Sequence, residues 1–145
     1  MPEIPLHYIS NAITWAKSKL GSTDYRGKCL AFTEDAYEQS NDLEIFGGDS
    51  AQESADIYEA GNKELPPPLG AFVFFSCKGE VEGKIMNWGH VGIAIENGEI
   101  IHAWDKVRID SLEAMVELVP PPGWSKLEYL GWSPVERIFQ GYIKH

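Results

Sequence analysis

Three side chains in this sequence have the types and positions for acyl-transfer chemistry: Cys29, His90 and His102. Cys29 is expected in the first turn of a helix, where the positive end of the helix dipole lowers the pKa of the thiol. A thiol nucleophile also needs a base, and histidine suits that task near neutral pH. Of the four histidines, His7 lies in the N-terminal lead and His145 is the last residue, which leaves His90 and His102.

A predicted β-hairpin carries both histidines. The Asn-Gly pair at 97–98 favours a tight turn, and apolar strands are expected on either side, over residues 90–95 and 99–104. His90 opens the first strand, and His102 lies near the end of the second.

The turn also predicts which residues face one another. A two-residue turn places His90 opposite residue 105 and His102 opposite residue 93. We infer that both imidazoles reach one face near one edge of the sheet. One histidine would take the proton from sulfur and the other would orient it, as in a catalytic triad.

Other interpretations of the same residues stay open at this point. Cys29 is compatible with a small buried apolar residue, and each histidine with a structural role in its strand. Cys29 and Cys77, the two cysteines of the chain, could form a disulfide. Cys29, His90 and His102 could instead bind zinc, although their spacing matches no compact metal motif.

The elements that position these residues predict an α+β domain, with helices first and an antiparallel sheet second. The chain of 145 residues fits one domain, 1–145. The pattern predicts helices over 9–20, 28–40 and 50–60, strands over 71–75, 90–95, 99–104 and 107–109, a short helix or turn over 111–117, and weaker strands over 127–130 and 137–142.

The net charge of the chain disfavours one class of function. The chain has 22 acids against 12 bases, a formal net charge of -10, and this disfavours nucleic-acid binding. Ten acids and one base lie between residues 34 and 64. This segment is either a solvated face or a surface that attracts a cationic group and repels anionic polymers.

The N-terminal residues, 1–7, show no export signal, and no apolar run approaches the roughly 18 residues of a membrane span. We therefore expect no membrane insertion and synthesis in the cytoplasm; action elsewhere would follow release.

Several motifs together resemble the NlpC/P60 family, papain-like cysteine peptidases of the bacterial cell wall. The most specific is the Gly-His-Val-Gly-Ile strand over 89–93, followed twelve residues after its histidine by His102-Ala103. A Trp-Gly-His-Val run at 88–91 is also similar to the related CHAP family. The other matching segments, within a resemblance that spans about 13–105, are Leu20–Tyr25, Cys29–Phe32 and Pro68–Phe75.

The resemblance implies a papain-like fold in which a helix bearing the nucleophile packs against an antiparallel sheet. It implies Cys29 as nucleophile, His90 as base and His102 as the orienting residue. It also implies that Tyr25 and the backbone N–H of Cys29 stabilise the oxyanion. Lys28, which directly precedes the cysteine, should favour the thiolate further.

We therefore expect a cysteine peptidase or amidase that cuts amide bonds in peptidoglycan stem peptides. Trp88, Trp104 and Asp105 flank the two histidines and are expected to line the substrate cleft. No cofactor and no metal are expected. The alternatives are a binding or regulatory module with the same fold but no hydrolysis, and acyl transfer or deamidation through the same thiol.

Overall fold

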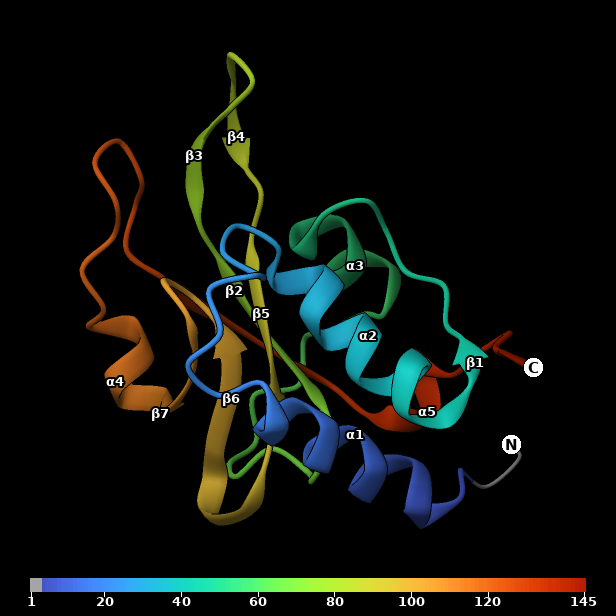
Figure 1. Ribbon diagram of the computed structural model, residues 1–145. Coiled ribbons are helices and arrows are strands. Elements are labelled where there is room, and N and C mark those ends of the chain that lie inside the picture. The colour runs from blue at the N-terminus through green and yellow to red at the C-terminus, as the bar shows by residue number, and fades with distance from the viewer. Residues whose placement is uncertain (1–3) are drawn as a thin grey trace.

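The computed structural model describes residues 4–145, so the first three residues of the predicted domain 1–145 lie outside the described part (Figure 1). Its elements are α1 (Leu6–Ser18), α2 (Cys29–Asn41), β1 (Leu43–Glu44), α3 (Ala51–Ile57), β2 (Phe72–Ser76), β3 (Lys78–Val81), β4 (Lys84–Asn87), β5 (His90–Ala94), a 3-10 turn (Glu96–Gly98), β6 (Glu99–Ala103), β7 (Val107–Ser111), α4 (Leu112–Val116), β8 (Glu128–Ser133), α5 (Val135–Ile138) and β9 (Ile143–Lys144).

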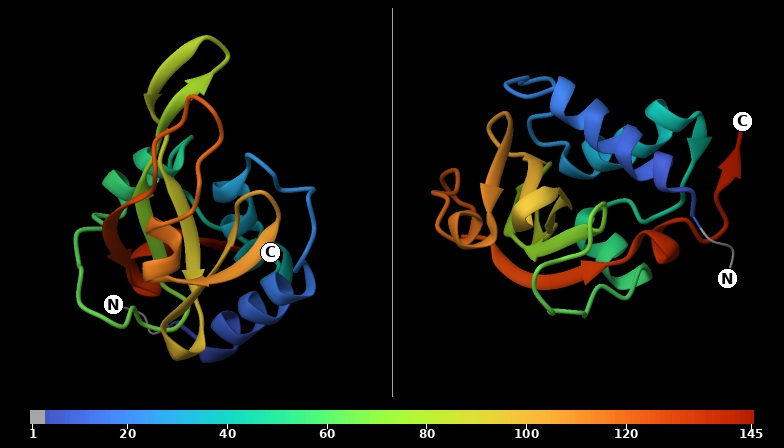
Figure 2. Two further views of the ribbon diagram at one scale, coloured as in Figure 1. Left: turned by 90° about the vertical axis from the view of Figure 1, so that its left-hand side faces the viewer. Right: turned by 90° about the horizontal axis from the view of Figure 1, so that it is seen from below.

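The central sheet has five antiparallel strands in the order β7-β6-β5-β2-β8. Because successive residues of a strand point to opposite faces, its side chains divide between two apolar clusters. Phe72, Phe74 and Val91 pack with the helical layer, which α1 and α2 form over one side of the sheet (Figure 2). Val73 and Phe75 pack on the other side with α4 and the segment 127–132. The α+β prediction is confirmed.

Helix α2 carries the candidate nucleophile at its first residue. Its buried stripe includes Phe32, Ala36 and Tyr37, at the spacing of one helical face. The hydroxyl of Tyr37 donates to the Gly70 carbonyl at 2.7 Å, which ties the helix to the start of β2. The position of Cys29 is therefore fixed by packing that lies one to two turns further along the helix.

Other predicted elements differ from the observed ones near their ends. The strand expected over 137–142 is wrong, because Pro134 precedes a helical turn, α5, that occupies 135–138. The β3–β4 hairpin was not expected. Most of its side chains are exposed, so its sequence lacks the apolar alternation that predicts a half-buried strand. It projects beyond the sheet (Figure 1).

The β5–β6 hairpin has a different register from the predicted one. Its loop holds three residues, Glu96–Gly98, and the Ile95 N–H donates to the Glu99 carbonyl across it at 2.8 Å. His102 therefore pairs with Gly92 and not with residue 93. A slip of one residue turns every side chain of a strand to the other face, so this register puts His90 and His102 on the same face.

Gly92 provides the space that His102 needs. A Cβ at Gly92 would lie 2.5 Å from Cγ2 of Ile100 and 3.0 Å from Cβ of His102. We expect Gly92→Ala to lower the free energy of unfolding by about 1–3 kcal/mol, because the crowded side chains must move. Urea denaturation measures this change. Gly61→Ala is the control, since nothing lies within 4 Å of its Cβ position; equal losses in the two variants would contradict the account.

Candidate active site

A cleft of about 1200 Å³ collects most of the candidate residues. Cys29 and His90 both line it, each as the first residue of its element. Trp88, Trp104 and Asp105 line it as well. The structure thus brings together residues from three distant parts of the sequence.

The Cys29 thiol is free and half-buried. Burial raises the pKa of this thiol to about 11, while the backbone N–H groups of Val91, Leu30 and Cys29 itself act to lower it. The lowered pKa expected from the helix dipole and Lys28 is therefore wrong, because loss of solvent outweighs both. Because the N–H of Val91 acts on the thiol, Sγ of Cys29 lies beside Val91, the residue that follows His90. At neutral pH the thiol keeps its proton until a base removes it.

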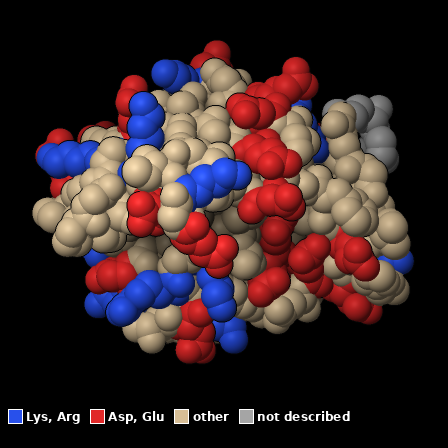
Figure 3. Space-filling model, turned by 90° about the horizontal axis from the view of Figure 1, so that it is seen from above, with Lys and Arg blue, Asp and Glu red and all other residues tan. Residues whose placement is uncertain are grey.

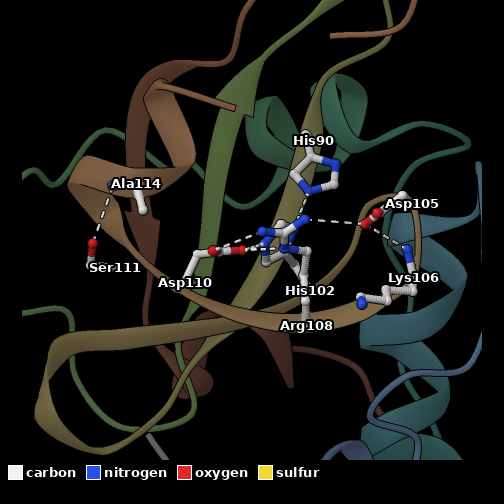
Figure 4. A network of polar contacts seen from close by, with 8 residues as sticks. All are labelled: His90, His102, Asp105, Lys106, Arg108, Asp110, Ser111 and Ala114. Atoms are coloured by element: carbon white, nitrogen blue, oxygen red, sulfur yellow. Dashed lines mark hydrogen bonds and ion pairs between the residues drawn. The ribbon is translucent and has the colours of Figure 1, made fainter. Parts of the chain in front are cut away.

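Two buried histidines and one carboxylate form a line of hydrogen bonds, which we call the imidazole relay (His90, His102 and Asp110). Nε2 of His90 lies 2.9 Å from Nδ1 of His102, and Nε2 of His102 lies 2.8 Å from Oδ2 of Asp110 (Figure 4). The two imidazole rings are nearly perpendicular, at 88°. His90 is 4% exposed and His102 is fully buried, so water competes little for these bonds.

The carboxylate of Asp110 determines which atoms donate and which accept in the hydrogen bonds of the relay. The hydrogen bond from His102 and the pairing with Arg108 lower the pKa of Asp110, so this group is ionised and only accepts. His102 must therefore carry its proton on Nε2, and its Nδ1 accepts the proton on Nε2 of His90. The tautomer of His90 follows: its Nδ1 has a free lone pair, and it points away from His102 (Figure 4).

Both imidazoles are neutral in this state. Burial and the neighbouring His102 lower the pKa of His90 well below its usual value. Burial also lowers the pKa of His102, against the opposing effect of Asp110. A neutral His90 with a free Nδ1 has the protonation state that a general base requires.

Arg108 fixes the carboxylate. Its Nε donates to Oδ2 of Asp110 at 2.8 Å, and its Nη1 donates to Oδ1 of Asp105 at 3.3 Å. Asp110 and Arg108 are the site residues that the sequence interpretation missed. The signal was the alternation of apolar and charged residues over 107–110, which puts both charges on one face of a strand.

Tyr25 does not reach the cleft. Its hydroxyl donates to Oδ2 of Asp35 at 2.7 Å, and its ring packs edge-on against Trp15 and Phe32. Burial, followed by that hydrogen bond, raises the pKa of Tyr25 to about 12. The structure therefore does not bring this hydroxyl to the thiol as expected.

Acidic side chains form a band on the face seen in Figure 3, on the side of the molecule where α2 and α3 lie. Glu34 and Asp49 extend this acidity into the cleft lining. Burial, with the nearby Glu38 and Asp35, raises the pKa of Glu34 to about 7. The acidic segment 34–64 therefore borders the site itself.

The metal and disulfide alternatives find no support in the geometry. Within residues 4–145, no group of three or more His, Cys, Asp and Glu side chains could hold a metal ion. Three of the four imidazole nitrogens of His90 and His102 are used in the relay, and both cysteines have free thiols. None of the helices in the described part is long and apolar enough to cross a membrane.

A thiol at a helix N-terminus and a buried histidine on an antiparallel sheet line one cleft, which is the arrangement expected of a papain-like fold. The NlpC/P60 family model matches residues 17–117, more than half of the chain, and the chain belongs to this family. Comparison with curated proteins and with solved structures gave no match.

The raised pKa of Cys29 predicts how alkylation depends on pH. Since the thiolate is the reactive form, the rate with iodoacetamide should rise about tenfold per pH unit and reach half its maximum near pH 11. Mass spectrometry of the peptide that carries Cys29 separates its reaction from that of Cys77. A half-maximal rate below about pH 8 would show instead that the thiolate is stabilised.

Proposed function

We propose that this protein is a cysteine peptidase or amidase that hydrolyses amide bonds in peptidoglycan stem peptides. One observation carries the proposal: the relay leaves His90 neutral, with a free Nδ1, in the cleft that holds the Cys29 thiol. Membership of the NlpC/P60 family supports a cell-wall substrate.

The first half of the reaction forms an acyl-enzyme. Cys29 Sγ attacks the scissile carbonyl while Nδ1 of His90 takes the thiol proton. The backbone N–H of Cys29, at the N-terminus of α2, stabilises the oxyanion. His90 then passes the proton to the amine nitrogen, the C–N bond breaks and the amine leaves.

The second half restores the thiol. His90 takes a proton from water, the resulting hydroxide attacks the thioester carbonyl, the C–S bond breaks, and His90 returns the proton to Sγ. In both halves His90 is transiently an imidazolium whose charge is favoured by the hydrogen bond to His102 and, beyond it, by Asp110. His102 and Asp110 are therefore positioning residues, since neither touches the reacting atoms.

Catalysis accounts for the relay better than a purely structural module does. Burying two imidazoles and a carboxylate costs solvation that apolar side chains of similar size would avoid. Acyl transfer or deamidation would use the same thiol and histidine, and the products distinguish them from hydrolysis. The location predicted from the sequence, cytoplasmic synthesis with action at the wall after release, stays a prediction.

Mass spectrometry of purified stem peptides incubated with the protein tests the proposal. Hydrolysis should give two products whose masses add up to the substrate plus one water, whereas transfer to another amine would not add water. Cys29→Ala should abolish the reaction, and Cys77→Ala, which removes the other thiol, should not. Cleavage that survives in Cys29→Ala, or intact substrate with the wild type, would refute the proposal.

The role of Asp110 gives a separate prediction. Asp110→Asn removes the charge and lets an amide N–H face His102, which reverses the tautomers along the relay. We expect kcat to fall by up to about 10⁴-fold, while the far-ultraviolet circular dichroism is unchanged. The pH dependence of kcat should also shift, because the negative charge of Asp110 no longer stabilises the protonated form of His90. Asp56→Asn, an equal charge change at an exposed position, is the control; matching losses would exclude a specific role.

A further inference from the structure

Two cations of the segment that leads into α2 lie next to the thiol. Arg26 and Lys28 both line the cleft, and Lys28 directly precedes Cys29. Because adjacent Cα atoms are about 3.8 Å apart, the Lys28 ammonium, on its flexible four-carbon stem, can reach a group that is bound at the thiol. The proposed mechanism uses neither cation. Burial still raises the pKa of Cys29, so activation of the thiol does not account for Lys28 either.

Neither of these cations has an acidic partner. Within residues 4–145, no carboxylate lies within 4.0 Å of either charged group. Nε of Arg26 donates to the backbone carbonyl of Asp105 at 3.2 Å, which anchors the guanidinium and leaves its two Nη groups without an acceptor in the described part of the chain. An anchored guanidinium with two free Nη groups offers the fork that binds a carboxylate through two parallel hydrogen bonds.

The third cation of the lining, Arg108, is different. Its guanidinium already donates to Asp110 and to Asp105, so it is occupied within the protein. A substrate carboxylate that bound Arg108 would have to compete with both of these acids. Arg26 and Lys28 are therefore the cations of the lining that remain available to a ligand.

The acidic lining residues do not cancel the charge of this segment. Glu34 lies five residues after the thiol, about 7.5 Å further along the axis of α2, and its pKa is raised to about 7 by burial. Asp49 comes from the separate segment 48–51. The three residues that precede Cys29 contribute two positive charges and no negative one. A carboxylate bound there would meet both cations and the positive end of the α2 dipole.

We propose that Arg26 and Lys28 form a binding site for a carboxylate of the substrate, close to the scissile amide. The site selects stem peptides in which that carboxylate is free over stem peptides in which it is amidated. This inference rests on the proposed function for the identity of the substrate, and it adds a specificity that the family assignment leaves open. Arg26 and Lys28 are specificity-determining residues, because no step of the acyl transfer uses them.

Alkylation of Cys29 by paired reagents tests the site without a choice of scissile bond. Iodoacetate and 3-maleimidopropionate carry a carboxylate at a shorter and at a longer distance from the carbon that sulfur attacks. Iodoacetamide and 3-maleimidopropionamide are their neutral counterparts. Sγ displaces iodide from the first pair and adds to the maleimide C=C bond of the second, whose other carbon takes a proton from water. At about pH 8 both buried imidazoles are neutral, so they cannot supply the attraction.

The measured quantity is the ratio of the acid rate to the amide rate at Cys29, divided by the same ratio for N-acetylcysteine. For at least one pair this normalised ratio should be about ten or more, the factor that corresponds to one charge-assisted hydrogen bond. Arg26→Gln and Lys28→Gln should each lower it, and the double variant should bring it to about one. Arg26→Lys, which keeps the charge, should retain more of it than Arg26→Gln.

Lys63→Gln is the matched control for Lys28→Gln. Both lysines are exposed, and within the described residues neither forms an ion pair, but Lys63 lies outside the cleft lining. This control should keep the normalised ratio of the wild type. In the stem-peptide assay, the wild type should hydrolyse free acids faster than amidated peptides, and the double variant should lose that difference.

The outcomes separate the two proposals. A normalised ratio of about one for both reagent pairs would overturn the inference. A raised ratio that persists in the double variant, or that falls equally in Lys63→Gln, would also overturn it, because the carboxylate would then bind elsewhere. Equal hydrolysis of free and amidated stem peptides would overturn the proposed selectivity and leave the proposed function intact. Stem peptides that stay intact, with a raised ratio that the double variant abolishes, would overturn the proposed function and leave the carboxylate site.

Discussion

The hydrogen bond between Asp110 and His102 is the interaction on which the chemistry of this site depends. An ionised carboxylate has lone pairs and no proton to donate, so it dictates which nitrogen of His102 carries hydrogen. That choice passes to His90 through the 2.9 Å contact between the rings. Arg108 donates to the same Oδ2 through Nε and to Oδ1 through Nη2, which favours the ionised form of Asp110. Asp110, acting through His102, thereby sets the protonation state of His90, which is the base of the proposed mechanism.

The same burial that excludes water from the two imidazoles also keeps them uncharged. The pKa of Cys29 is raised and that of His90 is lowered, both first of all by desolvation. The resting site is therefore a neutral thiol and a neutral imidazole instead of an ion pair. In the proposed mechanism, proton transfer accompanies attack on the substrate, and His90 acts as general base. Charge then appears only in the acyl-transfer steps, where the helix N-terminus would stabilise the negative charge and Asp110 the positive charge.

The residues that line the cleft also include both acidic and apolar side chains. Glu34 and Asp49 of the acidic segment 34–64 line the cleft together with Cys29, and the lining also includes tryptophan, proline and aliphatic side chains. The sequence alone left a choice between a solvated acidic face and a selective one. Because Glu34 and Asp49 line the cleft, part of that acidic face borders the candidate site. The rest of the band lies outside the cleft, and it would repel anionic polymers from this side of the molecule.

The sequence predicted the α+β architecture from its periodicity and the NlpC/P60 family from the resemblance of its motifs, and both are confirmed. These features depend on helical and strand periodicity and on a few short motifs. Such local patterns are visible along the chain. The catalytic roles of Cys29, His90 and His102 stay a prediction. Only the tertiary structure decided the register of the β5–β6 hairpin, because a three-residue loop in place of a two-residue turn changes the facing of every side chain after it. It also decided the role of Asp110, the removal of Tyr25 from the site and the raised pKa of Cys29. Each of these depends on contacts between distant segments and on solvent exclusion, which no single stretch of sequence contains.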